Sequence, residues 1–412
     1  MKSDLDRLMA DRGFDAILVT GASHNNPVMY YLANGATLGE GSMLLKKRGE
    51  QPSLIVWSAE RDEAAKSGLN VIDVAKYNLR DILNEEKGDR LKAAIRGREI
   101  IFSDLGITGK VALYGMEEQG RSLVLTNAFN AYQGKVQIVG EYTDTIFDAA
   151  WTTKDPDEIE RIRAVGQKTM QVVGNTAEFL QSHRASDGVL CKADGKPLTV
   201  GDVNREIKRW MMNLNIEDPE GVIFAIGRDA GVPHSSGEDS DPIALGKTIV
   251  YDIFPREAGG GYFFDFTRTW CLGFAPPEVE KSYRDVMDTF DMLISSMKMG
   301  DGTREHERAT WEMLESRGHP SIWSDPHTTR GYIHSLGHGV GLQVHERPFF
   351  GDVEGNTDTL APNSVVTIEP GVYYPDDGGY GIRIEDCVWM NPTTGRFEPL
   401  ADYSKELVLP IG

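Results

Sequence analysis

Two aspartates stand among large apolar residues in the segment 251–270, which reads YDIFPREAGGGYFFDFTRTW. The pattern predicts two strands joined by a glycine-rich turn. Asp252 shares a strand face with Phe254, and Asp265 shares one with Phe263. The number of residues between the aspartates is even, so a regular hairpin can place them directly opposite, about 5 Å apart at Cβ. Two such anions repel by roughly 4 kcal/mol at 4 Å and an effective dielectric of 20. A cation or a shared proton must therefore offset the repulsion.

A second pair of carboxylates lies downstream. Residues 365–371 (VVTIEPG) form a predicted strand that carries Glu369, and residues 381–390 (GIRIEDCVWM) form another that carries Glu385. Residues 375–379 (PDDGG) supply the predicted turn between them. Four carboxylates on two such units suit a hard or borderline divalent cation.

Histidines cluster between these two units. The segment 333–348, IHSLGHGVGLQVHERP, contains His334, His338 and His345, with glycines on alternate positions that allow close approach of another group. An imidazole among the carboxylates would add affinity for Mn, Co, Fe or Zn. His234, in the polar loop GVPHSSGED, is a fourth candidate. The alternative is that these histidines are ordinary core or loop residues.

The order of five residues resembles that of a known family. The strings DFTRTW, GHGVGLQVHERP, TIEPGVY and GIRIED are similar to motifs of the pita-bread metallopeptidases (peptidase family M24). That family includes methionine aminopeptidase, aminopeptidase P and prolidase, with creatinase as a metal-free relative. The resemblance covers roughly residues 155–412. The first part of the chain looks like the creatinase-type domain of prolidase and aminopeptidase P, which methionine aminopeptidases lack.

The resemblance implies a fold and a reaction. An α/β N-terminal domain of the creatinase type, residues 1–150, would precede an α+β pita-bread catalytic domain, residues 155–412. The enzyme would be a hydrolase of the Xaa-Pro bond, acting on dipeptides or peptide N-termini through a hydroxide that bridges two metal ions. Small peptides would be its substrates, and a homodimer its expected assembly.

The resemblance also assigns roles to residues. Two divalent ions, Mn or Co in the first place and Zn or Fe otherwise, would bind a set of five side chains in which Asp265 and Glu385 bridge. These ligands are Asp252, Asp265, His338, Glu369 and Glu385. Glu369 would also accept the proton of the attacking water. His345 and His234 would contact the substrate or stabilise the tetrahedral intermediate. Arg383, two residues from Glu385 and on the same strand face, would lie beside that glutamate.

The sequence departs from the usual prolidase pattern at one place. The spacing from Asp252 to Asp265 is thirteen, where prolidases usually have eleven, and the additional pair falls in the turn REAGGG. An insertion of two preserves the alternation of strand faces, whereas one extra residue would turn a ligand away. Both aspartates are therefore retained as ligands.

Three other functions remain open at this point. The first is a hydrolase or lyase of the same fold acting on a small non-peptide amide or osmolyte. The second is a metal-free enzyme like creatinase, which the complete set of five ligands disfavours. The third is a catalytically inactive binding scaffold. A serine hydrolase is unsupported because no G-x-S-x-G motif occurs.

The elements that must position these residues fall into two regions. In the first, Ser3–Arg12 is a predicted helix, and the predicted strands are Ala16–Thr20, Ser53–Trp57, Glu99–Phe102 and Val111–Tyr114. This pattern is typical of an α/β domain.

The second region begins with the helix-start signal DPDE at Asp155. It combines an N-cap aspartate, a proline at the first helical position and an acidic residue for a capping box. That helix should run to about Leu180, followed by a surface loop, a second helix and a later helical stretch. These three are Ser182–Leu198, Val200–Leu214 and Glu278–Gly318.

Composition narrows the partners. The net charge of −20 over 412 residues disfavours nucleic acid and anionic membranes, which both require basic patches. The three cysteines are far apart and odd in number, so no disulfide framework is expected. No apolar run approaches the ~20 residues of a membrane span, and the N-terminus has no signal-peptide core. The expected location is the cytoplasm.

Overall fold

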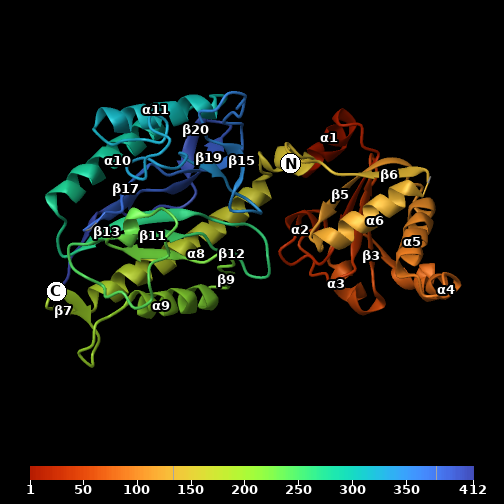
Figure 1. Cartoon of the computed structure of the whole chain (residues 1–412), viewed down its shortest axis with the longest axis horizontal. Coiled ribbons are helices and arrows are strands. Elements are labelled where there is room, and N and C mark those ends of the chain that lie inside the picture. Colours follow the sequence, from red (N-terminus) through yellow and green to blue (C-terminus); the bar gives the residue numbers. More distant parts are fainter. Residues whose placement is uncertain (133, 377) are drawn as a thin grey trace. The chain divides into compact units, whose positions relative to one another are not determined.

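The computed structural model describes residues 1–132, 134–376 and 378–412. The chain divides into two compact units (Figure 1). The first comprises Met1–Ala150 with Gly259–Gly261, and the second comprises Trp151–Ala258 and Tyr262–Gly412. No helix among the described residues combines the length and the apolar content that crossing a membrane requires.

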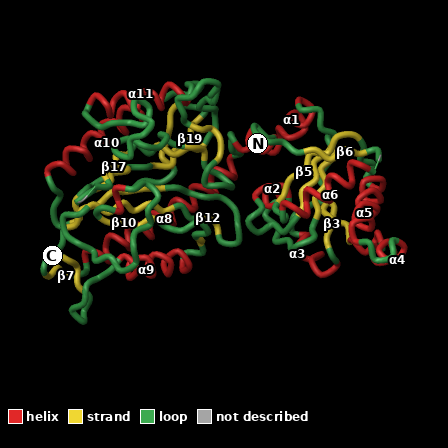
Figure 2. Tube along the Cα trace, in the orientation of Figure 1, coloured by secondary structure: helices red, strands yellow, loops and turns green. Residues whose placement is uncertain are grey.

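The first unit is a mixed sheet with helices around it (Figure 2). Its strand order is β4-β3-β2-β1-β5-β6, with β2 antiparallel to both neighbours and the other pairs parallel. The strands are β1 (Ala16–Thr20), β2 (Met43–Lys47), β3 (Ser53–Val56), β4 (Asn70–Asp73), β5 (Gly109–Gly115) and β6 (Val136–Val139). The helices are α1 (Leu5–Asp11), α2 (Pro27–Leu32), α3 (Arg61–Ala65), α4 (Leu79–Glu85), α5 (Arg90–Asp104), α6 (Gln119–Ala131) and α7 (Ile146–Trp151), with 3-10 turns η1 (Lys2–Asp4), η2 (Ser58–Glu60) and η3 (Val74–Tyr77).

Most of the elements predicted in this unit are confirmed, but the strand predicted at Glu99–Phe102 is wrong. Those residues belong to α5, which begins after Asp89, whose side chain accepts the Lys92 N–H at 3.1 Å. Ile95, Ile101 and Phe102 are buried and all belong to the core beneath the helix. A short run of three apolar residues, such as IIF in this segment, has the same appearance in a strand and on the buried face of a helix.

The described part of the second unit contains several small sheets and four α-helices that begin after residue 155. The main sheets have the orders β10-β11-β13-β21 and β15-β14-β16-β19-β20, and the pairs β17-β18, β12-β9 and β7-β8 complete the set. The helices are α8 (Pro156–Gln181), α9 (Val200–Asn213), α10 (Pro277–Ser296) and α11 (Thr303–Ser316), with the 3-10 turn η4 (Asp229–Gly231). The strands are β7 (Arg184–Ser186), β8 (Val189–Cys191), β9 (Ile216–Glu217), β10 (Ile223–Ile226), β11 (Thr248–Ile253), β12 (Arg256–Glu257), β13 (Phe266–Leu272), β14 (His338–Gly339), β15 (Glu346–Phe349), β16 (Val365–Ile368), β17 (Gly371–Tyr374), β18 (Tyr380–Arg383), β19 (Asp386–Asn391), β20 (Arg396–Pro399) and β21 (Val408–Leu409).

The helices predicted in this unit are confirmed. The Asp155 N–H donates to the Glu158 carboxylate at 2.6 Å, as a capping box requires. The helical stretch predicted at Glu278–Gly318 corresponds to α10, which begins one residue earlier at Pro277, and α11. The surface loop predicted at Ser182–Leu198 differs, because it contains the short hairpin β7–β8. Its strands are three residues each, too short to produce a readable alternation.

Helices cover the sheets of the second unit on two sides. In Figure 1, α10 and α11 lie above the strands and α8 and α9 lie below them. The upper core joins Val286 and Leu293 of α10 and Leu314 of α11 to Ile368 and Val388 of the sheet. These residues are almost completely withdrawn from water, which is the main source of stability in such a layer.

On the lower side, α8 contacts the sheet through Thr176, whose hydroxyl lies 3.3 Å from that of Tyr251 on β11. Because side chains alternate along a strand, Asp252 faces the opposite side, away from α8.

A buried ion pair fixes the start of the second unit to the segment that carries His345. Lys154 Nζ donates to Glu346 Oε2 at 2.8 Å, and each side chain is only 2% exposed. Lys154 also donates to the carbonyl of Trp151, and the other Glu346 oxygen accepts the Gln343 N–H at 3.0 Å. Removing one partner would leave the other charge buried without compensation.

We therefore expect Lys154→Met to lower the free energy of unfolding by about 3–5 kcal/mol, measured by urea denaturation. Lys192→Met is the matched control, because the Lys192–Asp202 pair is partly exposed (36% and 15%), and it should cost less than about 1 kcal/mol. Lys154→Met combined with Glu346→Gln should recover part of the loss. Equal costs for the two single variants would contradict the structural role of the buried pair.

Candidate metal centre

The hairpin that carries the two aspartates has a different register from the predicted one. Asp252 on β11 pairs with Thr267 on β13, not with Asp265. Asp265 is therefore a diagonal neighbour of Asp252 on the same face, a relation that separates residues by about 7–8 Å. The prediction that the two aspartates stand directly opposite each other is wrong by two residues. In the observed register they still lie on the same face of the hairpin.

The position of the turn explains this shift. The register continues through a bridge between Arg256 and Phe263, and the Glu257 N–H donates to the Tyr262 carbonyl at 3.1 Å. The loop is thus centred on the glycines Gly259–Gly261, which all have positive φ (88°, 107° and 119°). Other residues rarely adopt this conformation, so the turn forms one residue later than a symmetric hairpin between the aspartates would require.

The second pair of carboxylates stands at an interruption in a long hairpin. Ile368 pairs with Asp386 in β16–β19, and Gly371 pairs with Arg383 in β17–β18, which is one continuous register. Glu369 and Glu385 occupy opposite positions between these two ladders. Asp377, in the turn predicted at residues 375–379, lies outside the described residues.

The interruption has a clear backbone origin. Pro370 has no N–H and cannot continue the ladder. The Glu369 N–H donates instead to the Leu336 carbonyl at 2.8 Å, and the Glu385 N–H donates to the Thr267 carbonyl at 3.1 Å. Each glutamate therefore joins its hairpin to another segment of the site, the histidine segment in one case and β13 in the other.

The glycines around His338 allow neighbouring backbone segments to pack closely against β14. A Cβ atom at Gly337 would overlap the Thr367 carbonyl, and one at Gly339 would overlap the Arg347 carbonyl. The close approach predicted from these glycines is present, but the neighbouring group is backbone. It brings β14 against β15 and β16, and so places the His338 side chain beside the carboxylates.

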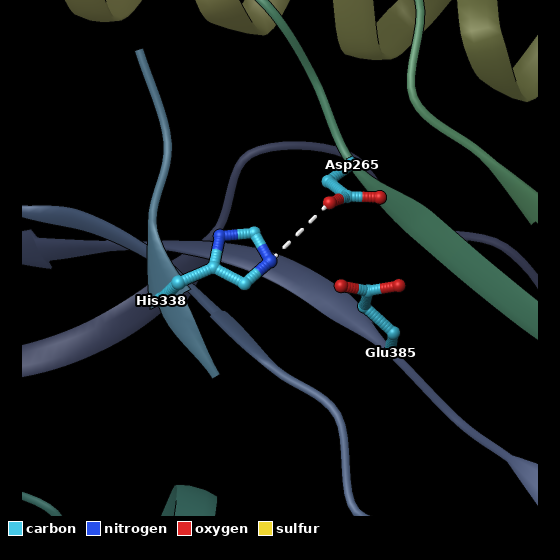
Figure 3. A group of neighbouring side chains, drawn as sticks. All are labelled: Asp265, His338 and Glu385. Atoms are coloured by element: carbon cyan, nitrogen blue, oxygen red, sulfur yellow. Dashed lines mark ion pairs between the residues drawn. The ribbon is translucent and has the colours of Figure 1, made fainter. Parts of the chain in front are cut away.

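All the predicted site residues line one cavity of about 660 Å³ in the second unit. They are Asp252, Asp265, His338, Glu369 and Glu385 as predicted ligands, with His234, His345 and Arg383. His334 also lines this cavity. Figure 3 shows that Asp265, His338 and Glu385 point toward one another. One ligand atom from each lies within 4.8 Å of the other two.

His338 is close to two of the acids. Its Nε2 atom lies 3.5 Å from Asp265 Oδ2 (Figure 3, dashed line) and 3.4 Å from Glu369 Oε1. The Nδ1 atom lies 3.1 Å from the Gly339 carbonyl, which would fix the ring with a proton on Nδ1 and leave Nε2 free to bind a cation.

A buried guanidinium compensates one of the carboxylates. Arg383 Nη2 donates to Asp252 Oδ2 at 2.5 Å and Nη1 donates to the Tyr373 hydroxyl at 2.6 Å. Its Nε donates to the Thr267 hydroxyl at 3.2 Å, and that hydroxyl donates to Glu385 Oε2 at 2.6 Å. Arg383 and Glu385 thus meet at the same threonine, in agreement with their predicted shared face.

Sequence reasoning assigned no role to Thr267 and Tyr373. Each continues the face of a predicted ligand: Thr267 follows Asp265 by two positions, and Tyr373 follows Glu369 by four. Extending the period of two along each strand would have found them. His334, in the predicted cluster but without an assigned role, contacts the Tyr373 hydroxyl through Nε2 at 3.0 Å.

Comparison with known proteins decides the family. The model of metallopeptidase family M24 matches residues 160–392, more than half of the chain and the whole span that contains the predicted ligands. The chain belongs to metallopeptidase family M24.

Relatives in this family include dipeptidases. The Xaa-Pro dipeptidase of Pyrococcus horikoshii is 26% identical over 406 residues, which cover 97% of this chain and 96% of that protein. The probable dipeptidase PepE of Mycobacterium tuberculosis is 28% identical over 235 residues. That match covers 57% of this chain and 55% of PepE, so the chain spans about half the length of that relative.

Solved structures confirm the predicted fold class. An Xaa-Pro dipeptidase from Bacillus anthracis superposes with a TM-score of 0.74 at 21% identity, covering 99% of each chain. An X-Pro aminopeptidase from Thermotoga maritima gives 0.73 at 23% identity, covering 98% of this chain and 100% of that one. The second unit accordingly has the pita-bread fold, preceded by the α/β unit.

The metallopeptidases of family M24 depend on metal ions, and the donors of this cavity fit such ions. Oδ1 of Asp252 and Oδ1 of Asp265 are buried and accept no hydrogen bond from any described residue. A buried carboxylate oxygen without a donor is costly, and a cation would satisfy it. Oxygen donors with one imidazole suit borderline divalent ions such as Mn, Co, Fe or Zn.

The charges lead to the same conclusion. Burial, together with the charges of Glu385 and Asp252, raises the pKa of Asp265 well above its usual range. Burial and the charge of Glu385 likewise raise the pKa of Glu369. The pKa of Glu385 rises from 4.5 to about 8, first through burial and then through the charge of Asp252. The carboxylates therefore require positive charge in addition to Arg383, supplied by protons or by metal ions.

Burial acts in the opposite direction on the histidines. It lowers the pKa of His338 to about 3, assisted by the neighbouring His345, and it lowers the pKa of His345. Neutral imidazole is the form that binds a metal. A neutral His345 could stabilise a tetrahedral intermediate only by donating its N–H, because the ring then carries no positive charge.

We expect Asp265→Asn and Glu385→Gln each to abolish metal loading while the protein stays folded, because each removes an anionic donor from the closest group. Metal content of purified protein, with circular dichroism as the folding check, measures this. Glu220→Gln is the matched control, since Glu220 lines the cavity outside the group. Normal metal content in either ligand variant would refute the assignment.

Metal-free protein should show a characteristic dependence of stability on pH. A carboxyl group with a raised pKa holds its proton more tightly in the folded protein, so its contribution to stability is lost as pH rises. For Glu385 this window runs from 4.5 to about 8. We expect the Tm of metal-free Glu385→Gln to exceed that of metal-free wild type by a margin that widens across this window. Scanning calorimetry in the presence of a chelator measures it, and a constant or narrowing margin would contradict the electrostatic account.

Proposed function

We propose that the chain is a metal-dependent peptidase that cleaves the Xaa-Pro bond of dipeptides or of peptide N-termini. One observation carries the proposal: four carboxylates and an imidazole line a single cavity that also holds His234, His345 and Arg383. The similarity to Xaa-Pro dipeptidases over almost the whole chain supports the choice of substrate.

The metal centre in this proposal contains two divalent ions, with Mn or Co as the expected species. Asp252, Asp265, His338, Glu369 and Glu385 would hold them, and the unpartnered oxygens of the two aspartates are the donors best prepared for this. Bound ions of this kind supply a nucleophilic water at neutral pH and polarise the scissile carbonyl.

The chain's own residues perform the proton transfers and the orientation. The raised pKa of Glu369 suits a base that takes a proton from the attacking water and passes it to the leaving nitrogen. The Thr367 hydroxyl donates to Glu369 Oε1 at 3.3 Å and fixes that carboxylate. His345 and exposed His234, both on the cavity wall, would donate an N–H to the carbonyl oxygen as negative charge develops there.

The rest of the cavity suits an apolar residue beside the scissile bond. Its walls carry the apolar side chains Val222, Ile223, Pro233, Phe254, Val344 and Phe349. The nitrogen of an Xaa-Pro bond carries no N–H, so it needs no hydrogen-bond acceptor on the cavity wall. A prolyl ring could therefore pack against these apolar side chains. The cavity volume of about 660 Å³ is in the range of sites for small ligands.

The decisive experiment is hydrolysis of Ala-Pro and Ala-Pro-Ala by protein that has been stripped with a chelator and reloaded with Mn²⁺ or Co²⁺. We expect turnover only in the reloaded protein, with kcat/KM for Ala-Pro or Ala-Pro-Ala at least about tenfold above that for Ala-Ala or Ala-Ala-Ala, because about 1.4 kcal/mol of selective binding gives that ratio. Release of alanine, followed by chromatography, measures the rates.

Failure to cleave either proline peptide in fully metal-loaded protein would refute the proposed substrate. Hydrolysis of small non-peptide amides by the same preparation would then favour the alternative reaction of the same fold. We also propose a homodimer, which sedimentation velocity tests directly.

A further inference from the structure

A buried carboxylate outside the cavity is hydrogen-bonded to the segment that carries the histidines. Glu307 lies on α11, and its side chain is fully withdrawn from water. No salt bridge to this residue is present among the described residues, although a buried carboxylate usually has a cationic partner. Its stabilisation therefore comes from hydrogen-bond donors.

Three donors converge on this carboxylate. Glu307 Oε1 accepts the Trp323 indole N–H at 2.9 Å and the Tyr332 hydroxyl at 3.0 Å. Glu307 Oε2 accepts the backbone N–H of Leu336 at 2.6 Å, the shortest of the three contacts. The carboxylate thus joins helix α11 to both ends of the stretch 332–336, in the middle of which His334 stands.

The Leu336 residue connects this carboxylate to the proposed metal centre. Its N–H donates to Glu307, and its carbonyl accepts the Glu369 N–H at 2.8 Å. Two residues later, the His338 N–H donates to the Thr367 hydroxyl at 3.1 Å. A displacement of Leu336 would therefore move the backbone of one proposed ligand, Glu369, and the chain that leads to the other, His338.

Resting on the metal centre proposed above, we propose that Glu307 is a positioning residue for that centre. It holds the Leu336 peptide so that Glu369 and His338 keep the separation needed to bind one ion between them. It lines no part of the cavity and reaches Glu369 through the Leu336 peptide.

The chemistry of the donors explains why a carboxylate is needed here. The Trp323 indole N–H and the Leu336 backbone N–H can only donate, and they approach different oxygens of Glu307, so both of these oxygens must accept. Glutamine offers one oxygen and an amide NH₂, and would place a donor against a donor on one side. Aspartate is one methylene shorter and cannot reach the same three groups from the same helix position.

The test measures the affinity for Mn²⁺ by isothermal titration calorimetry, with Ala-Pro turnover as the second readout. We expect Glu307→Ala to weaken Mn²⁺ binding and lower kcat by about tenfold or more, as loss of an outer support of a metal ligand commonly does. The Mn²⁺ affinity and kcat of Glu307→Gln should lie between those of Glu307→Ala and wild type. Trp323→Phe leaves Leu336 bonded to the carboxylate, and its Mn²⁺ affinity should stay within about threefold of wild type.

The matched control is Glu315→Ala on the same helix. Glu315 accepts a hydrogen bond from the Ser321 hydroxyl at 2.6 Å, and no hydrogen bond or ion pair among the described residues joins it to the stretch 332–338. It should bind Mn²⁺ as wild type does. If Glu307→Ala does not fold, Glu307→Gln, which keeps the side-chain volume, decides the question.

Mn²⁺ affinity within twofold of wild type in both Glu307 variants, with only a lower Tm, would show a purely structural role and overturn the proposal. An equal loss of Mn²⁺ affinity in Glu315→Ala would also overturn the proposal. If wild type binds Mn²⁺ but cleaves no proline peptide, the proposed function fails, while the order of affinities still decides for or against Glu307. If wild type binds neither Mn²⁺ nor Co²⁺, the metal centre and the role of Glu307 are both refuted.

Discussion

Repulsion among four buried carboxylates is the constraint on which the rest of the second unit depends. Two such charges a few ångströms apart oppose each other by roughly 3–4 kcal/mol at an effective dielectric of 20. The guanidinium of Arg383 faces these acids, but burial and the charges of neighbouring carboxylates still raise the pKa values of Asp265, Glu369 and Glu385. A protein does not retain such an arrangement for stability, because protonated or apolar groups would pack at lower cost. The cluster has uncompensated negative charge, which a bound divalent ion would neutralise.

The backbone withstands this repulsion because the strands that carry the acids are joined to neighbouring segments. The register of β11–β13 sets the two aspartates diagonally, which separates their charges while keeping them on one face. The glutamates stand where the long hairpin is interrupted, and their N–H groups bond to Leu336 and Thr267 in place of the ladder. Backbone hydrogen bonds therefore connect the aspartate hairpin, the histidine segment and the glutamate hairpin to one another. Outside it, Glu307 and the Lys154–Glu346 pair hold the histidine segment from two further directions.

Much of the site could be predicted from sequence, and the failures have physical reasons. Strand alternation is a local property, so the shared faces of Asp252 with Phe254 and of Arg383 with Glu385 could be inferred from spacing alone. Register is not local: three glycines with positive φ moved the turn by one residue and changed the partner of Asp252 to Thr267. The prediction of a strand at Glu99–Phe102 was wrong because three consecutive apolar residues occur equally in a strand and on the buried face of a helix. Glu307 could not be found at all, since its donors come from three separate positions that only tertiary packing brings together.

The glycine contacts around His338 have a consequence for how this scaffold can diversify. The backbone of Gly337 and Gly339 lies directly against the carbonyls of neighbouring strands, so no side chain can be added there without separating those strands. Val222 and Phe349, by contrast, line the wall of the same cavity. Substitutions that alter substrate choice are therefore expected at the wall residues, whereas Gly337 and Gly339 cannot be replaced without disturbing the strands around His338.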